Sequence, residues 1–161
     1  MSSIEKTKKA SQSDPNVLGH FISGKEVNSK EVGSAARTVK IYDPATGKVS
    51  KLVELADGDI LEQAIAAAES AFLGWRGTPP HKRSQVMFRF KQLLEENADD
   101  LCRAITSEHG KVLDDARGEL GRGIEVVEYA CGISELLKGE HSKNVGPGID
   151  SWSEFQALGI V

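Results

Sequence analysis

The sequence lacks an apolar run long enough to cross a bilayer, which takes about 20 residues. It also lacks an excess of positive charge, because 20 lysines and arginines are balanced by 24 aspartates and glutamates, and the formal net charge is −4. Charge of this size and sign gives no strong attraction to nucleic acid or to an anionic membrane. No spacing typical of a Cys/His metal site, a P-loop or a metalloprotease helix occurs. We therefore expect neither nucleic acid nor a membrane as a partner, and no metal site.

Cysteine is also scarce, with only Cys102 and Cys131 in the chain. Both lie in apolar stretches with helical spacing, which favours buried free thiols in a reducing compartment over a disulfide. The first residues carry charge but no apolar segment, so they do not form a secretory signal. We expect a disordered, solvated tail over residues 1–17.

What the sequence does contain is typical of a soluble one-domain protein, with 39% hydrophobic and 27% charged residues over 161 positions. A compact chain of this length buries roughly 68–70% of its unfolded surface, which is enough for a core. Residues 18–56 predict short antiparallel strands, because Ser23-Gly24 and the segment 43–47 are turn sequences between β-rich stretches. These strands carry little apolar surface and need a partner.

Residues 57–139 have the apolar spacing of helices. We expect a first helix capped by Asp57 or Asp59 and ended by Gly74 and Gly77, and a second that starts at Pro79-Pro80. Asn97 is predicted to end the second helix and cap the third, and Gly110 to end the third. The fourth, about residues 112–138, is the longest and is predicted to end at Gly139.

The fourth helix holds several glycines, each costing roughly 1 kcal/mol relative to alanine. Gly118, Gly121 and Gly123 favour tight packing, most simply against a sheet, although close approach of a ligand is the alternative. They are not a dinucleotide-binding loop, because they lie inside a helical pattern instead of after a strand. Residues 140–161 predict two extended segments around the turn at 146–148. The chain ends within the second, which we interpret as truncation.

The segment 107–125 carries the most specific pattern. It reads Glu-x-Gly-Lys at 108–111, Asp-Ala-x-x-Glu at 115–119 and Gly-Arg-Gly-Ile-Glu at 121–125. This order resembles the N-terminal region of aldehyde dehydrogenases, and the last motif narrows it to the CoA-acylating methylmalonate-semialdehyde dehydrogenase branch. The resemblance spans most of the chain, with further matching segments at 20–25, 43–47, 64–68, 86–90 and 126–132.

The resemblance implies an α/β fold, of which this chain would be the N-terminal part. That part would consist of short strands, a four-helix cluster belonging to the NAD-binding domain (57–139), and an oligomerisation hairpin (140–161), without the Rossmann and catalytic parts. Family members oxidise an aldehyde with NAD, through a cysteine thiolate, and pass the acyl group to coenzyme A; this branch acts on methylmalonate and malonate semialdehyde. The intact protein is expected to form dimers or tetramers.

For individual residues, the resemblance implies one substrate-binding side chain, Arg122, which would hold the substrate carboxylate. From the residues alone, an ion pair of Arg122 with Glu119 or Glu125 is the alternative. Guanidinium suits a carboxylate because it offers a bidentate fork of donors. No catalytic and no cofactor-binding residue is assigned, because neither Cys102 nor Cys131 matches the nucleophile's motif.

The chain departs from the family where an Arg-x-Pro-Leu-Gly segment is usual, because residues 155–159 read Phe-Gln-Ala-Leu-Gly. We expect the 161 residues alone to be inactive and not to bind NAD. Two other hypotheses stay open: an inactive truncated domain that only associates with subunits, and another aldehyde dehydrogenase branch without coenzyme A. The N-terminal stretch, which lacks arginine, favours a bacterial cytoplasm over a mitochondrion.

Overall fold

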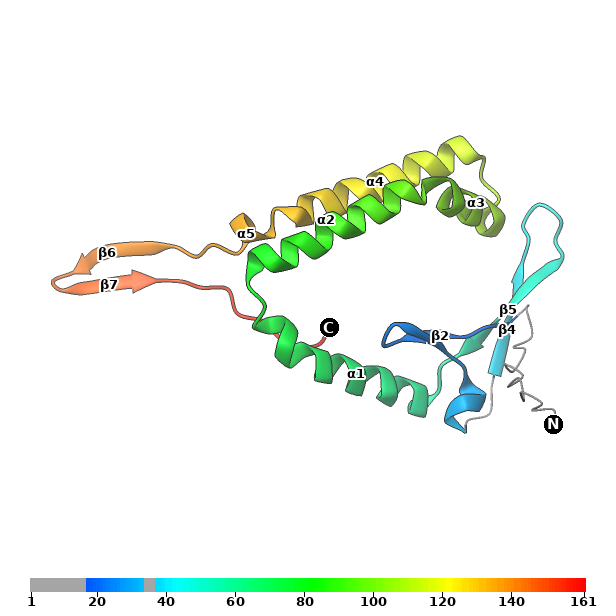
Figure 1. Cartoon of the computed structure of the whole chain (residues 1–161), viewed down its shortest axis with the longest axis horizontal. Helices are drawn as coiled ribbons and strands as arrows, with labels where there is room; N and C mark the ends of the chain where they lie inside the picture. Colours follow the sequence, from blue (N-terminus) through cyan, green and yellow to red (C-terminus); the bar gives the residue numbers. More distant parts are fainter. Residues whose placement is uncertain (1–16, 34–36) are drawn as a thin grey trace, which may run out of the picture.

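A computed structural model describes residues 17–33 and 37–161. The strands and the short 3-10 helix η1 come first: β1 Val17–Leu18, β2 His20–Ile22, β3 Lys25–Val27, η1 Ser29–Val32, β4 Arg37–Tyr42 and β5 Val49–Leu55. The helices follow: α1 Gly58–Arg76, α2 Pro80–Glu96, α3 Ala98–His109, α4 Leu113–Cys131 and α5 Ile133–Leu136. A hairpin of β6 His141–Gly146 and β7 Ile149–Trp152 comes last. Figure 1 shows the hairpin projecting from one end of the helices.

The strands form three small sheets, ordered β1-β5-β4, β2-β3 and β6-β7. The expected turns are present, with Ser23 and Gly24 at positive φ between β2 and β3. One strand differs from expectation: β1 pairs in parallel with β5, with Val17 opposite Leu52. Val17, which was predicted to belong to a tail over residues 1–17, is therefore part of a strand, and residues 1–16 of that prediction lie outside the described residues.

The first helix is capped as predicted by Asp57, whose side chain accepts a hydrogen bond of 3.1 Å from the backbone N–H of Ile60. It runs through Gly74 and ends at Gly77, so the expected stop at Gly74 is wrong. One glycine costs a helix only about 1 kcal/mol, and the turns on either side outweigh that. Ile60 packs with Ile22 and Val27 in a small core, which joins α1 to the strands.

The other helices form a separate bundle in which α4 packs against α2 and α3 (Figure 1). The Ser84 hydroxyl donates a 2.6 Å hydrogen bond to the Cys131 carbonyl, so the start of α2 lies beside the end of α4. The two helices are therefore antiparallel. Cys102 and Cys131 are buried free thiols, as predicted.

Two details of the bundle differ from the sequence-based expectations. Asn97 does stand between α2 and α3, but its side chain donates back to the Leu93 carbonyl at 2.7 Å and makes no cap for α3. The fourth helix is not continuous to residue 138, because it ends at Gly132 and α5 follows as a separate turn. Gly139 marks the base of the hairpin instead: a Cβ there would lie 1.7 Å from the Ser153 carbonyl oxygen.

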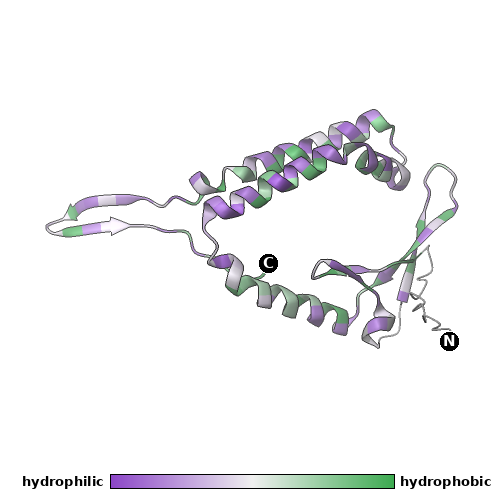
Figure 2. Ribbon diagram, in the orientation of Figure 1, coloured by the Kyte–Doolittle hydropathy of each residue, from purple (hydrophilic) through white to green (hydrophobic). Residues whose placement is uncertain are grey.

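The chain does not close a core of the predicted size. Its accessible surface is 12833 Å², against about 7,900 Å² for a compact monomer of 17.4 kDa. Much of the apolar stripe of α2 is exposed, including Val86, Phe90 and Leu93. Figure 2 shows apolar and polar residues alternating along α2 and α4. Within the described ranges, no helix is both long and apolar enough to cross a membrane.

Candidate functional site

The turn between α3 and α4 is fixed by a glycine and a proline from distant parts of the chain. Gly110 ends α3 with φ +82°, and its N–H donates 2.8 Å to the Thr106 carbonyl. This left-handed cap was predicted, and it favours glycine because a side chain would be strained. Pro44, from the β4–β5 turn, lies against it, and a Cβ on Gly110 would sit 2.8 Å from the proline ring.

Two ion pairs flank this turn. Lys51 of β5 pairs with Glu108 at 2.7 Å, which joins the strands to the end of α3. On the other side of Gly110, Lys111 Nζ donates a hydrogen bond to Glu119 Oε2, two turns into α4. The Lys111 side chain is only 20% exposed, so this pair is less open to solvent than the others around it.

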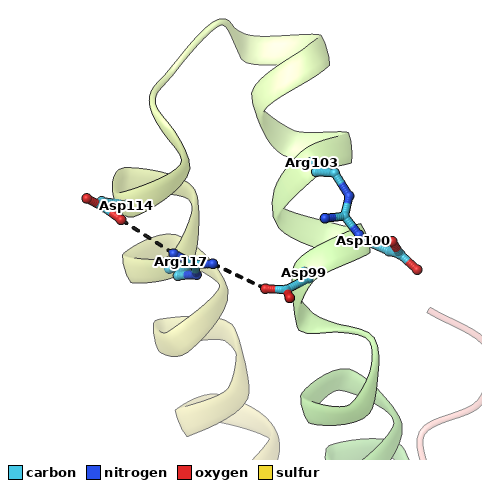
Figure 3. Close-up of polar contacts among 5 residues, drawn as sticks. All are labelled: Asp99, Asp100, Arg103, Asp114 and Arg117. Carbon is cyan, nitrogen blue, oxygen red and sulfur yellow. Dashed lines mark hydrogen bonds and ion pairs between the residues drawn. The ribbon is translucent and has the colours of Figure 1, made fainter.

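A third set of charges joins α3 to α4. Arg117 pairs with Asp99 of α3 at 3.2 Å and with Asp114 of its own helix at 3.5 Å (Figure 3). Arg103, on α3, pairs with Asp100 at 2.5 Å. The guanidinium of Arg117 is thus shared between two carboxylates and serves to hold the helices together.

Beside these contacts, the surface of α4 is hollowed into an open depression of about 520 Å³. It is lined by side chains of both charges and one glycine: His109, Lys111, Asp114, Asp115, Gly118 and Arg122. Gly118 lies mid-helix, and a Cβ built there meets nothing within 4 Å. The same holds for Gly121 and Gly123, so the expected packing of these glycines against a sheet is not made by the described residues.

Arg122 lies at this depression with its side chain exposed. In the part of the chain that the structure describes, its guanidinium makes neither an ion pair nor a hydrogen bond. Pairing with Glu119 or Glu125 is therefore not what the structure shows. Glu119 is taken by Lys111, and that hydrogen bond lowers the pKa of the Glu119 carboxyl, with smaller effects of His109 and Arg122.

The two cysteines are poorly placed for chemistry. Cys102 is 1% exposed, and the Cys131 thiol contacts the Val127 carbonyl at 3.4 Å. Neither lines the depression. No cluster of possible metal ligands occurs among the described residues, and the glycines of α4 lie inside a helix, which gives no cradle for a dinucleotide phosphate.

Lys111 and Glu119 both lie within the sequence motifs, but the motifs do not predict that the two residues pair. Their separation of eight residues across a turn is not a spacing that places two side chains together on one helix. The pairing depends on the left-handed conformation of Gly110, which was predicted, and on the path that the chain takes after it, which was not.

These features belong to a known class of enzyme fold. The model of the aldehyde dehydrogenase family matches residues 32–161, so the chain belongs to that family. Malonate-semialdehyde dehydrogenase of Pseudomonas aeruginosa is 54% identical over 84% of this chain. The acylating methylmalonate-semialdehyde dehydrogenase of Arabidopsis thaliana mitochondria is 38% identical over 91%. The resemblance inferred from the motifs is thus confirmed.

Solved structures agree with the sequence comparison. Methylmalonate-semialdehyde dehydrogenase of Oceanimonas doudoroffii superposes with a TM-score of 0.81 at 58% identity over 88% of this chain. A protein of the same description from Sinorhizobium meliloti, complexed with NAD, gives 0.83 at 41% identity over 89%. The chain spans only 28% of either protein and 27% of the Pseudomonas relative. Its α/β structure therefore matches one part of the aldehyde dehydrogenase fold.

Proposed function

We propose that this chain is the N-terminal part of an NAD-dependent, CoA-acylating dehydrogenase of methylmalonate or malonate semialdehyde. The observation that carries the proposal is Arg122, whose guanidinium lies at a polar depression and has no partner among the residues that the structure describes. It lies within a chain that is 54% identical to a malonate-semialdehyde dehydrogenase. Arg117, five residues earlier on the same helix, is by contrast paired with Asp99 and Asp114.

Arg122 would bind the carboxylate that these semialdehydes carry away from the reacting aldehyde carbon. Two parallel N–H donors match two carboxylate oxygens, which fixes the orientation of the substrate as well as its charge. Glycines at 121 and 123 leave the backbone on both sides uncovered.

The NAD and coenzyme A of this reaction would bind outside the described residues. NAD would supply the hydride acceptor and coenzyme A the acyl acceptor. The glycines of α4 lie within a helix and form no phosphate-binding loop, so neither group would bind there. The catalytic nucleophile would likewise lie in the part of the relatives that this chain does not span. The 161 residues by themselves are therefore expected to be inactive.

The β6–β7 hairpin would join subunits into dimers or tetramers. It projects from the helices (Figure 1) with exposed apolar side chains at Val145, Ile149 and Trp152. In a two-stranded sheet each strand also has an edge of free backbone donors and acceptors that can pair with another chain. A cytoplasmic bacterial location is proposed along with this, since the Pseudomonas relative is bacterial.

The test is an assay of NADH formation by the full-length enzyme with malonate semialdehyde, with and without coenzyme A, with the products identified by mass spectrometry. A CoA thioester formed only when coenzyme A is present supports the proposal. Turnover to the free acid, independent of coenzyme A, would instead favour a branch without that co-substrate. Absence of NAD binding and turnover in the full-length protein would favour the remaining alternative, a domain that only associates with subunits.

A further inference from the structure

We infer that Lys111 is a positioning residue that holds Glu119 away from Arg122 and so leaves the Arg122 guanidinium free for a carboxylated substrate. The inference rests on the proposed function, since it assigns a task to the same depression. Lys111 would act through Glu119, without contact to the substrate.

The need for such a residue follows from the spacing on α4. Glu119 precedes Arg122 by three residues, and side chains at this spacing are neighbours on a helix surface. An acidic residue on the N-terminal side of a basic one is also the favourable orientation for pairing. Glu125, three residues after Arg122, has the reverse orientation and competes less.

The structure shows how the competition is avoided. Lys111 Nζ donates to Glu119 Oε2, and this contact is the largest cause of the lowered pKa of Glu119. Arg122 also contributes to that lowered pKa, so the guanidinium is within electrostatic reach of the same carboxylate without bonding it. Of the aspartates at the depression, Asp114 is already paired with Arg117, and Asp115 lies seven residues before Arg122.

The residues just before Lys111 are in contact with the strands. Gly110, which contacts Pro44, sets the direction in which the chain leaves α3. The ion pair of Lys51 with Glu108 joins the end of α3 to β5. The lysine therefore reaches α4 from a turn that contacts both Pro44 and, through Glu108, Lys51 of β5.

The experiment uses the full-length enzyme with four substitutions: Lys111→Met, Glu119→Gln, the two combined, and Lys111→Arg. Lys111→Met should raise KM for malonate semialdehyde about 2- to 5-fold. Without Lys111, Glu119 pairs with Arg122 as its neighbour on the helix, and the substrate has to displace Glu119. The kcat should stay within twofold, and KM for propionaldehyde, which has no carboxylate, should not change. Glu119→Gln, the combined variant and Lys111→Arg should all keep the wild-type KM.

Lys138→Met is the matched control, because Lys138 makes an exposed ion pair with Glu135 at 2.5 Å, far along the chain from the depression. It should leave both KM values unchanged. An unchanged KM in Lys111→Met, or a raised KM that Glu119→Gln does not restore, overturns the inference.

A second measurement does not depend on the substrate. The rate at which phenylglyoxal modifies Arg122, followed by peptide mass spectrometry, should fall in Lys111→Met and recover in the combined variant. Arg103 and Arg117 serve as internal references, since both are already paired. If Arg122→Ala affects acidic and neutral aldehydes alike, the proposed function fails; the labelling rates still decide whether Lys111 governs the pairing of Arg122, and equal rates in all variants overturn the inference.

Discussion

The two halves of α4 differ in how they are held. The first half, residues 113–120, is tied to its surroundings by charges: Arg117 to α3 and Glu119 to the preceding turn. The second half, residues 121–131, holds Arg122, which has no partner among the described residues. This half is joined to α2 through the buried bond of Ser84 to Cys131 and a longer ion pair of Lys91 with Glu128, at 3.9 Å. Arg117 and Arg122 are five residues apart on one helix. Arg117 is paired with two carboxylates, whereas Arg122 has no partner among the described residues.

The partners of an arginine indicate its role more clearly than the residue type alone does. A guanidinium bound between two carboxylates, as in Figure 3, has little capacity left for a ligand. A guanidinium without partners retains its fork of donors and gains most from a carboxylate brought to it. Arg117 joins α3 to α4, whereas the proposed function gives Arg122 a binding role, and this contrast can be tested from either half of the helix.

The largest effect is expected at the free arginine. In the full-length enzyme, Arg122→Ala should lower kcat/KM for malonate semialdehyde about 10- to 100-fold, the loss of a hydrogen-bonded charge partner. The value for propionaldehyde should stay close to that of the wild type. Arg117→Ala is the control and should affect both aldehydes equally, if at all. An equal loss on both aldehydes with Arg122→Ala would contradict the assigned role.

The second effect concerns the attachment of the other half. Ser84→Ala removes the donor to the Cys131 carbonyl at a buried position, and should lower the free energy of unfolding by about 1–2 kcal/mol. Urea denaturation followed by circular dichroism measures it. Ser107→Ala removes a similar bond, to the Ala104 carbonyl at 2.8 Å, from an exposed site and should cost clearly less; equal losses would mean that burial of the Ser84 bond is unimportant.

A smaller effect of opposite sign is expected at the floor of the depression. Gly118→Ala should stabilise the chain by about 0.5–1 kcal/mol, because alanine favours the helix and the added methyl group meets open space. The same change at Gly139 should destabilise, since its Cβ would overlap the Ser153 carbonyl. Thermal unfolding of both variants checks the pair, and a destabilised Gly118→Ala would show that position 118 is packed.

The smallest expected effect is the pH dependence of the stability that the Glu119 carboxylate, paired with Lys111, contributes. The folded pKa of Glu119 is lowered, so its ionised form is favoured in the folded chain. The stabilisation is therefore present above the unfolded pKa of the carboxyl and is lost as the pH falls through the folded pKa. Wild type should exceed Glu119→Gln in stability at neutral pH, and the difference should vanish in acid; a difference that persists there would exclude the ion pair as its source.

Local signals predicted much of this fold, and for identifiable reasons. Gly110, Asp57 and Pro80 act within one or two turns, so their caps and helix starts were predicted correctly. Gly74 and Gly132 show the limit of the same rule. Both glycines lie within stretches of helical apolar spacing. Helix α1 nevertheless continues through Gly74, whereas α4 ends at Gly132. Whether a helix continues through a glycine depends on the stability of the turns on either side. The helix propensity of the single residue does not include that stability.

The candidate site was predictable only in part. Arg122 was found through a motif, whereas its freedom depends on Lys111, on the other side of a turn. The burial of apolar stripes also failed as an expectation, because periodicity shows which face of a helix is apolar and does not show what covers it. The stripe of α2 remains exposed at Phe90 and Leu93 in this chain.

The pair of Lys111 and Glu119 has a consequence for how substrate preference evolves. On the interpretation proposed for it, neither residue touches the aldehyde, yet both decide whether the arginine that does is available. A lineage could then weaken its preference for acidic aldehydes through one codon change at position 111, with the arginine still in place. Conservation of that arginine would be a poor guide to substrate range in such genomes unless position 111 were compared with it.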